Sequence, residues 1–209
     1  MLEREKETLK DQFEMEDQGE IHYCLGMFIK RNIDLKTLTI NQRAYLENLL
    51  KRFNMFDCKP VSTPIEVEKK FEKMKDGEKS ANARDYQAAI GSIMYAANAT
   101  RPDISSAVGV LSQFSSNQGQ KNFQGVKRIM RYLKGTLDYG LKFEAQDKGN
   151  IELHVYADAD WAGDVDTRKS TSGYLFQIGN ATISWRTEKQ TIVALSSIEA
   201  EFVLSVLCT

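Results

Sequence analysis

Cysteine is scarce in this sequence. Its 209 residues include only three, Cys24, Cys58 and Cys208, which lie far apart and in no CxxC spacing. A disulfide framework or a zinc site needs cysteines in pairs or at ligand spacing, so neither is expected. Reduced thiols fit an intracellular protein of the cytoplasm or the nucleus.

Long apolar runs and an excess of one charge are also lacking. No stretch of about 18 apolar residues occurs, and the N-terminus, MLEREKETLKDQF, is charged from the start, so we expect no membrane span and no signal peptide. The formal net charge of -1 argues against bulk attraction to nucleic acid but allows a local basic face. With 42% hydrophobic and 27% charged residues, the composition is typical of a globular protein.

Residues 1–56 carry the patterns of a hairpin and a helix. After a charged helix over 2–14, apolar residues alternate from 21 to 29, and Leu38 with Ile40 offers a returning strand. An apolar stripe at helical spacing then covers 41–53. Period-two alternation predicts strands, and spacing of three and four predicts a helix.

The middle of the chain changes from a charged segment to helices. Residues 57–84 contain Pro60 and Pro64 and are densely charged, which predicts a linker or a mobile loop. Residues 85–143 are richer in small and apolar residues and predict three helices, the last over 122–134.

Residues 144–209 switch to strands. Alternation and tight-turn signals predict three antiparallel strands, followed by a helix that begins near Ser196 or Ser197. The fold class is therefore mixed α/β of the α+β kind, ending in a βββα unit. We expect this unit to be poorly covered, with Ile183, Trp185 and part of the helix face exposed.

The stretch YADADWAGD at 156–164 is the strongest candidate for chemistry. Asp158 comes at the end of a predicted strand, where a rigid backbone fixes the carboxylate and a turn leaves it open to water. Mg²⁺ takes hard oxygen ligands, and a second carboxylate, Glu199 or Glu201, could come from the last helix. The alternative is that Asp158 and its acidic neighbours form an ordinary polar loop.

The helix over 122–134 is the candidate nucleic-acid surface. Its basic residues, spaced to follow a phosphate backbone, are Lys127, Arg128, Arg131 and Lys134. The alternative is an amphipathic helix with a solvated charged face.

Several motifs together resemble one family. The segment from YADADWAGD to ALSSIEAEF resembles the ribonuclease H part of copia-type retrotransposon polyproteins. FEMEDQGEIHYCLG resembles the stretch after the reverse-transcriptase catalytic strand of the same polyproteins. NQRAYLENLLKRFNMFDCKPVSTP, YQAAIGSIMYAANATRPDISSAVGVLSQFSSN and VKRIMRYLKGTLDYGL resemble the thumb and connection segments that follow. The motifs keep the family's order and cover nearly the whole chain.

The resemblance implies roles for particular residues. Asp158 matches the first metal-binding carboxylate, and Glu201 followed by Phe202 matches an E-aromatic-x-A pattern that carries the second, with Glu199 as the fallback. Arg168, Lys169 and Ser170, in the run RKSTSG, are implied to lie beside the substrate; a polar loop is the alternative. The family's enzymes synthesise DNA on an RNA template and degrade the RNA of an RNA–DNA hybrid with two Mg²⁺ ions.

Departures from the family lower the expected activity. The polymerase aspartates of the YxDD type and the later Asp-Asn carboxylate are absent, and Leu204 replaces the usual alanine. We therefore expect a piece of a polyprotein: the end of the reverse-transcriptase palm and thumb (1–56), a linker (57–84), a thumb or connection region (85–143) and the first half of a ribonuclease H-like domain (144–209). With two carboxylates it should be nearly inactive. The alternatives are a non-catalytic nucleic-acid-binding remnant that uses helix 122–134, or a pseudogene product without a role.

Overall fold

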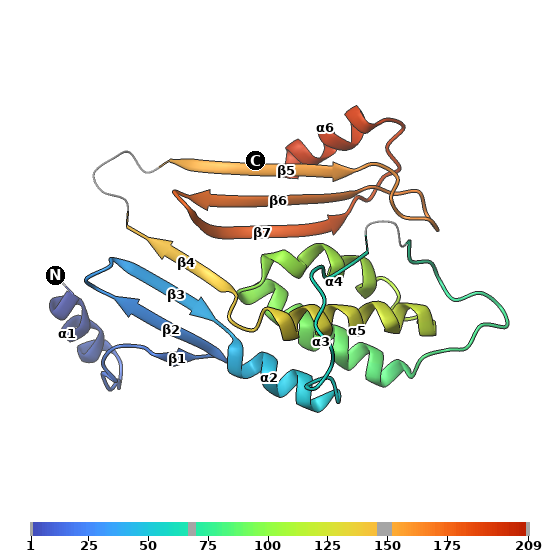
Figure 1. The fold of residues 1–209 in the computed structure, drawn as a ribbon. Coiled ribbons are helices and arrows are strands. Elements are labelled where there is room, and N and C mark those ends of the chain that lie inside the picture. Colours follow the sequence, from blue (N-terminus) through green and yellow to red (C-terminus); the bar gives the residue numbers. More distant parts are fainter. Residues whose placement is uncertain (1, 67–69, 146–151, 208–209) are drawn as a thin grey trace.

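Two antiparallel sheets lie side by side in one layer of the molecule (Figure 1). The computed structural model describes residues 2–66, 70–145 and 152–207. The first sheet has the order β1-β2-β3-β4, with bounds Tyr23–Cys24, Met27–Asn32, Thr37–Asn41 and Gly140–Glu144. The second has the order β5-β6-β7, with bounds Leu153–Asp160, Thr171–Ile178 and Ala181–Lys189. β4 contacts β7, so the sheets meet along these two strands.

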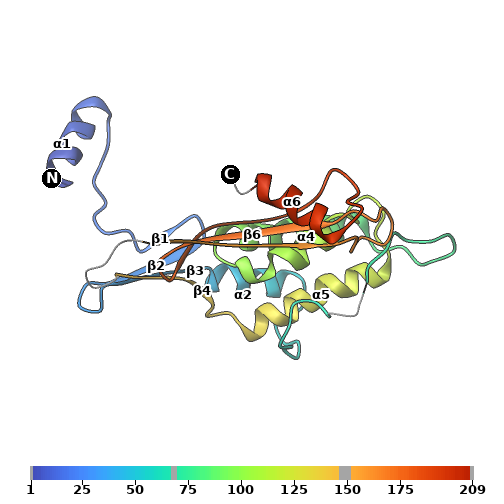
Figure 2. The same cartoon turned by 90° about the horizontal axis from the view of Figure 1, so that it is seen from above.

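Helices surround this layer. α6 (Ser197–Leu207) lies on one side of it, and α2 (Arg43–Arg52) and α5 (Gln120–Gly135) lie on the other (Figure 2). α3 (Ala83–Ala99), the short 3-10 helix η1 (Pro102–Ile104) and α4 (Ser105–Ser112) connect α2 to α5, and α4 contacts β7. α1 (Leu2–Gln12) stands apart from the rest (Figure 2).

The main hydrophobic core lies among α2, α3, α4 and α5. Leu46, Leu50, Ile93, Ile129 and Leu133 are fully buried there. α3 also carries alanines on its buried face, and small side chains let neighbouring helices approach closely. The helices predicted from apolar spacing over 41–53 and 85–134 are confirmed in kind and order.

The described parts of the charged segment, 57–66 and 70–84, pack against this core. Phe71 is 8% exposed and belongs to the core, and Val61 and Ile65 pack against it. The prediction of a mobile linker rested on charge density, which does not reveal that a few apolar residues among the charges are buried. The predicted domain boundaries stay predictions.

The first predicted strand is instead two short strands. Leu25 and Gly26 have φ values of 49° and 75°, and the chain reverses there, so that Cys24 pairs with Met27. The left-handed conformation suits Gly26, which has no Cβ, and it breaks the alternating stretch into β1 and β2. The next hairpin forms as expected, with Asn32 paired to Thr37.

The C-terminal unit has the predicted order of three antiparallel strands and a helix. Its core is small and is formed by Ala159, Ala194, Ala200 and Leu204. Outward-facing apolar side chains remain exposed as expected, with Ile183 at 46%, Ile198 at 80% and Phe202 at 70%.

Trp185 differs from that expectation. Its indole Nε1 donates a hydrogen bond of 2.8 Å to the carbonyl of Ala97 in α3, and the side chain is half-buried. The sequence of the C-terminal unit alone could not show that α3 lies against β7.

Among the described residues, no helix combines the length and apolar character needed to cross a membrane.

Candidate functional site

Asp158 lies near the end of β5, an edge strand of the three-stranded sheet. Its backbone pairs with Gly173 of β6, and the residue is exposed. Side chains alternate along a strand, and Ala159 packs against α6, so Asp158 points to the opposite face. There it lines an open cavity of about 450 Å³ with Tyr156 and Trp185. The strand fixes its backbone, and the carboxyl group remains accessible to water.

Glu201 reaches the same strand from α6. Its Oε1 accepts a hydrogen bond of 3.1 Å from the backbone N–H of Ala159. Ala200 and Leu204, on the buried side of α6, pack against Ala159 and hold the helix over the strand. The structure therefore brings the Glu201 carboxylate to the edge of β5, at the backbone position next to Asp158.

Glu199 has a different role, at the start of α6. Its backbone N–H donates to the Ser196 hydroxyl at 3.2 Å, and its Oε2 accepts from the backbone N–H of Leu195 at 2.7 Å. This reciprocal arrangement is close to a capping box, which satisfies N–H groups that the first helical turn leaves unpaired. Glu199 thus stabilises the end of the helix.

Asp158 and Glu201 each fit Mg²⁺ in chemical type, because both side chains offer hard carboxylate oxygens. The number of ligands is small. Within the parts of the chain that the structure describes, no group of three or more His, Cys, Asp or Glu side chains is arranged to hold a metal ion.

The three residues of the run RKSTSG that were expected beside the substrate lie in different environments. Arg168 is exposed, and its φ is 57°. The Lys169 ammonium group donates to the carbonyl of Thr191 at 2.5 Å. Ser170 is 0% exposed, and its hydroxyl accepts from the backbone N–H of Ala162. Ser170 therefore holds the loop together from inside, whereas Arg168 has its surface open to solvent.

Asp164 is the most strongly held carboxylate of the same loop. Its Oδ2 forms an ion pair of 2.6 Å with Lys189 of β7, and its Oδ1 accepts from both the N–H and the hydroxyl of Thr167. Burial raises the pKa of Asp164, but the hydrogen bonds from Lys189 and Thr167 outweigh it and lower the pKa below its ordinary value. The sequence contains no local signal for this pair, because its members lie 25 positions apart.

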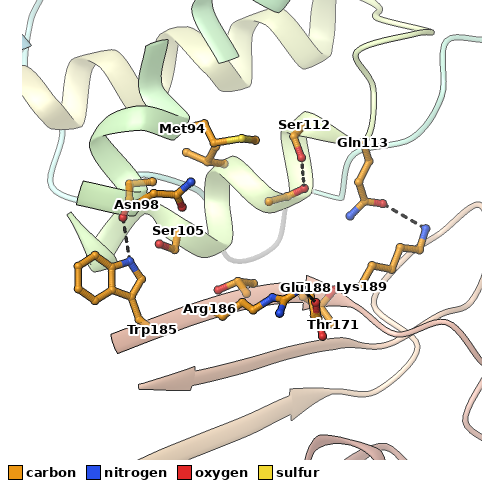
Figure 3. Close-up of a pocket in the computed structure, with 14 residues that line it drawn as sticks. Met94, Asn98, Ser105, Ser112, Gln113, Thr171, Trp185, Arg186, Glu188 and Lys189 are labelled. Atoms are coloured by element: carbon orange, nitrogen blue, oxygen red, sulfur yellow. Dashed lines mark hydrogen bonds and ion pairs between the residues drawn. The ribbon is translucent and has the colours of Figure 1, made fainter. Parts of the chain in front are cut away.

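A cavity of about 430 Å³ is lined by residues of α3, α4 and β7 (Figure 3). Two polar contacts close its ends: the hydrogen bond from Trp185 to Ala97, and one of 3.1 Å from the Lys189 ammonium group to Gln113 Oε1. Lys189 therefore binds both the Asp164 loop and the end of α4. These contacts position β7 against the helices.

The basic face of α5 is largely engaged with the segment before α3. Arg128 pairs with Glu66 at 2.7 Å and donates to the Thr63 hydroxyl at 2.9 Å. Arg131 donates to the carbonyl of Lys59 at 2.7 Å. The spacing of these arginines is as expected for a phosphate-binding helix, but in the structure they hold residues 59–66.

The two lysines of this face lie over aromatic rings. The Lys134 nitrogen is 3.9 Å from the ring centre of Phe56, and that of Lys127 is 5.1 Å from the ring centre of Phe123. Such cation–π contacts restrain a lysine without neutralising it. Lys127 is exposed and remains available to a further ligand.

Comparisons with known proteins give long and strong matches. The chain is 43% identical over 208 residues to the retrovirus-related Pol polyprotein from transposon TNT 1-94 of Nicotiana tabacum, which covers 97% of the chain and 15% of that protein. It is 42% identical over 204 residues to the retrovirus-related Pol polyprotein from transposon RE1 of Arabidopsis thaliana, and this match covers 97% of the chain and 13% of that protein. An uncharacterized mitochondrial protein of Arabidopsis thaliana is 36% identical over 194 residues, covering 93% of the chain and 78% of that protein.

These comparisons agree with the motifs. No family model matches the chain, and no solved structure gives a significant match. The chain spans about one seventh of the length of the Pol polyproteins it matches. The identity extends over both sheets and the helices between them, because it covers 97% of the chain. The chain belongs to the family of copia-type, retrovirus-related Pol polyproteins from transposons.

Proposed function

We propose that Asp158 and Glu201 are two of the metal-binding carboxylates of a site that cleaves the RNA strand of an RNA–DNA hybrid. The observation that supports the proposal is the hydrogen bond from the Ala159 N–H to Glu201 Oε1, which holds Glu201 at the edge of β5, at the backbone position next to Asp158. The Asp158 carboxylate, on the face away from α6, would turn toward that edge to share a metal ion with Glu201. Glu199 is the weaker candidate because its carboxylate caps α6.

The two carboxylates would act by holding negative charge at fixed positions for a metal ion. Mg²⁺, when bound, would lower the pKa of a water molecule and neutralise charge on the phosphodiester. Strand pairing holds the backbone of Asp158 and the buried face of α6 holds that of Glu201, so the backbone of neither residue needs to be ordered when the metal binds.

We also propose that the 209 residues alone cleave a hybrid slowly or not at all. Two carboxylates supply few of the ligands that two Mg²⁺ ions need, and Glu201 already uses one oxygen for the Ala159 N–H. RNA-directed DNA synthesis is a proposal for the whole polyprotein, and no residue of this chain is assigned to it. Because such hybrids arise inside cells, the expected location remains the cytoplasm or the nucleus.

Paramagnetic broadening by Mn²⁺ tests the assignment of the pair. In the wild-type chain, Mn²⁺ should broaden the backbone amide signals of residues 158, 159 and 201 before others. Asp158→Asn and Glu201→Gln should each remove this effect, whereas Glu199→Gln should retain it. Equal broadening in all four proteins would exclude the proposed pair.

A hybrid-cleavage assay tests the proposed inactivity. The chain with Mg²⁺ and a labelled RNA–DNA hybrid should give no product above background. Cleavage by the wild type that disappears in Asp158→Asn would overturn the proposed inactivity and strengthen the assignment of Asp158.

The alternative function, a nucleic-acid-binding remnant that acts through helix 122–134, has less support. Arg128 and Arg131 would first have to release Glu66 and the Lys59 carbonyl. If that face binds a hybrid, Arg131→Ala should weaken binding and reduce its dependence on salt.

A further inference from the structure

A positively charged cavity lies where α2, α3 and α5 meet, and no residue of the three-stranded sheet lines it. Its volume is about 350 Å³. Arg52 comes from the end of α2, Arg84 from the first turn of α3 and Lys127 from the middle of α5. Cations that are far apart in the sequence are therefore brought to one concave site.

The charges of this cavity are not balanced. Three positive side chains face one acidic residue, Asp85, among the lining residues. Over the described ranges, none of the three cations forms an ion pair, whereas Arg101 and Arg128 are each paired with a carboxylate. All three cations are exposed, and like charges held together in a concavity attract a counter-ion.

Aromatic rings hold two of the cations in place. The Arg52 guanidinium lies 5.4 Å from the ring centre of Phe53, and the Lys127 nitrogen lies 5.1 Å from that of Phe123. Phe123 in turn packs against the buried Tyr86 at 5.9 Å between ring centres. The rings reduce the conformational freedom that the cations would lose on binding a ligand.

The end of α2 places Arg52 and Phe53 at the cavity. Asn54 has a φ of 54°, and the N–H groups of Asn54 and Met55 donate to the carbonyls of Lys51 and Leu50. This is a Schellman pattern, which ends a helix sharply. It also satisfies helix-end carbonyls that would otherwise repel an anion.

We propose that this cavity binds a phosphate group. Guanidinium groups match phosphate oxygens with two parallel hydrogen bonds, and a lysine adds a compact charge. The phosphate could belong to a nucleic-acid strand or to a small phosphate compound, since both present the same oxygens. The inference does not rest on the carboxylate pair at β5, and it shares only Lys127 with the basic face of α5.

Two probes and a matched control test the site in the full chain. Binding of a labelled twelve-nucleotide oligothymidylate is measured by fluorescence anisotropy at low salt, about 50 mM. Binding of inorganic pyrophosphate is measured by calorimetry. The variants are Arg52→Ala, Arg84→Ala and Lys127→Ala, and the control is Lys30→Ala, which removes one exposed charge from β2. Thermal unfolding shows whether each variant is folded.

We expect each cavity variant to weaken binding about tenfold, because each removes charge-assisted hydrogen bonds, and Lys30→Ala to weaken it less than twofold. If the cavity variants bind both probes more weakly, the site is assigned to the phosphate of a nucleic-acid strand. If the cavity variants bind only pyrophosphate more weakly, the site is assigned to a small phosphate compound. The proposal is overturned if neither probe binds, or if the cavity variants behave as Lys30→Ala does.

Discussion

Gly125 has no side chain, and this lets Phe71, in the segment before α3, pack closely against α5. A Cβ at this position would lie 2.8 Å from the Phe71 ring and 3.0 Å from Leu111 Cδ2. Alanine favours a helix interior over glycine by about 0.5–1 kcal/mol, but overpacking a core costs about 1–3 kcal/mol. We therefore predict that Gly125→Ala lowers the free energy of unfolding by about 1 kcal/mol, measured by urea denaturation.

Gly91 supplies the matched control for that substitution. It is exposed in α3, and a Cβ there would meet no atom within 4 Å. Gly91→Ala should therefore stabilise the protein by about 0.5–1 kcal/mol through helix propensity alone. The account of Gly125 is wrong if both substitutions raise the free energy of unfolding.

Asp164 makes stability depend on acid pH. Its pKa lies below the ordinary value of 3.8, so its ionised form is stabilised in the folded state. The contribution is present above pH 3.8 and is lost as the pH falls through the lower, folded pKa. We predict that Asp164→Asn costs about 2 kcal/mol at pH 6, because it removes charged hydrogen bonds, and much less at pH 2.

Asp34 is the control for this pH dependence. It is exposed in the turn between β2 and β3. Urea denaturation of Asp34→Asn should follow the wild type at both pH values. A cost for Asp164→Asn that stays constant down to pH 2 would rule out the Lys189 pair as its cause.

Individual residues show how much of the candidate site could be predicted from the sequence. The place of Asp158 on a strand was predictable from the strand pattern, and that of Glu201 on the last helix from a family motif, whereas their metal-binding role stays a prediction. The environment of Arg128 was not predictable, because its partner Glu66 lies 62 positions earlier. Charge spacing on a helix shows which side chains share a face, but it does not show what covers that face.

α6 is the element that brings Glu201 to β5, and its N-terminus is capped by Ser196. Ser196→Ala removes the hydroxyl that accepts from the Glu199 N–H, which typically costs about 1 kcal/mol. We predict faster hydrogen exchange of the α6 amides in Ser196→Ala, with little change in α5. Ser205→Ala, which alters a hydroxyl near the other end of α6, should leave the first turn unaffected.

Elements with a regular apolar period were predicted well, and those set by tertiary contacts were not. α2, α5 and the strands of the C-terminal unit follow their spacing. β4 was missed because its five residues pair with β3, about 100 positions earlier, and the pairing supplies the order that the local sequence does not. The turn at Leu25 and Gly26 was missed because alternation continues across it.

At the scale of the whole molecule, the mixed α+β class was predictable from periodicity and family motifs, and so was the order of elements apart from β4 and the division between β1 and β2. The placement of the C-terminal sheet against α3 and α4 was not, because it depends on contacts such as Trp185 with Ala97 and Lys189 with Gln113. This placement leaves β5 and α6 at one side of the molecule, where the candidate pair lies (Figure 1).

A double-mutant cycle on divalent-metal affinity tests the central claim that Asp158 and Glu201 act together. Mn²⁺ affinity is measured by electron paramagnetic resonance for the wild type, Asp158→Asn, Glu201→Gln and the double variant. If both carboxylates hold one metal, either single change should remove most of the affinity, and the second should add little. Additive losses, or no loss in either single variant, would contradict the claim that the two residues form one metal site.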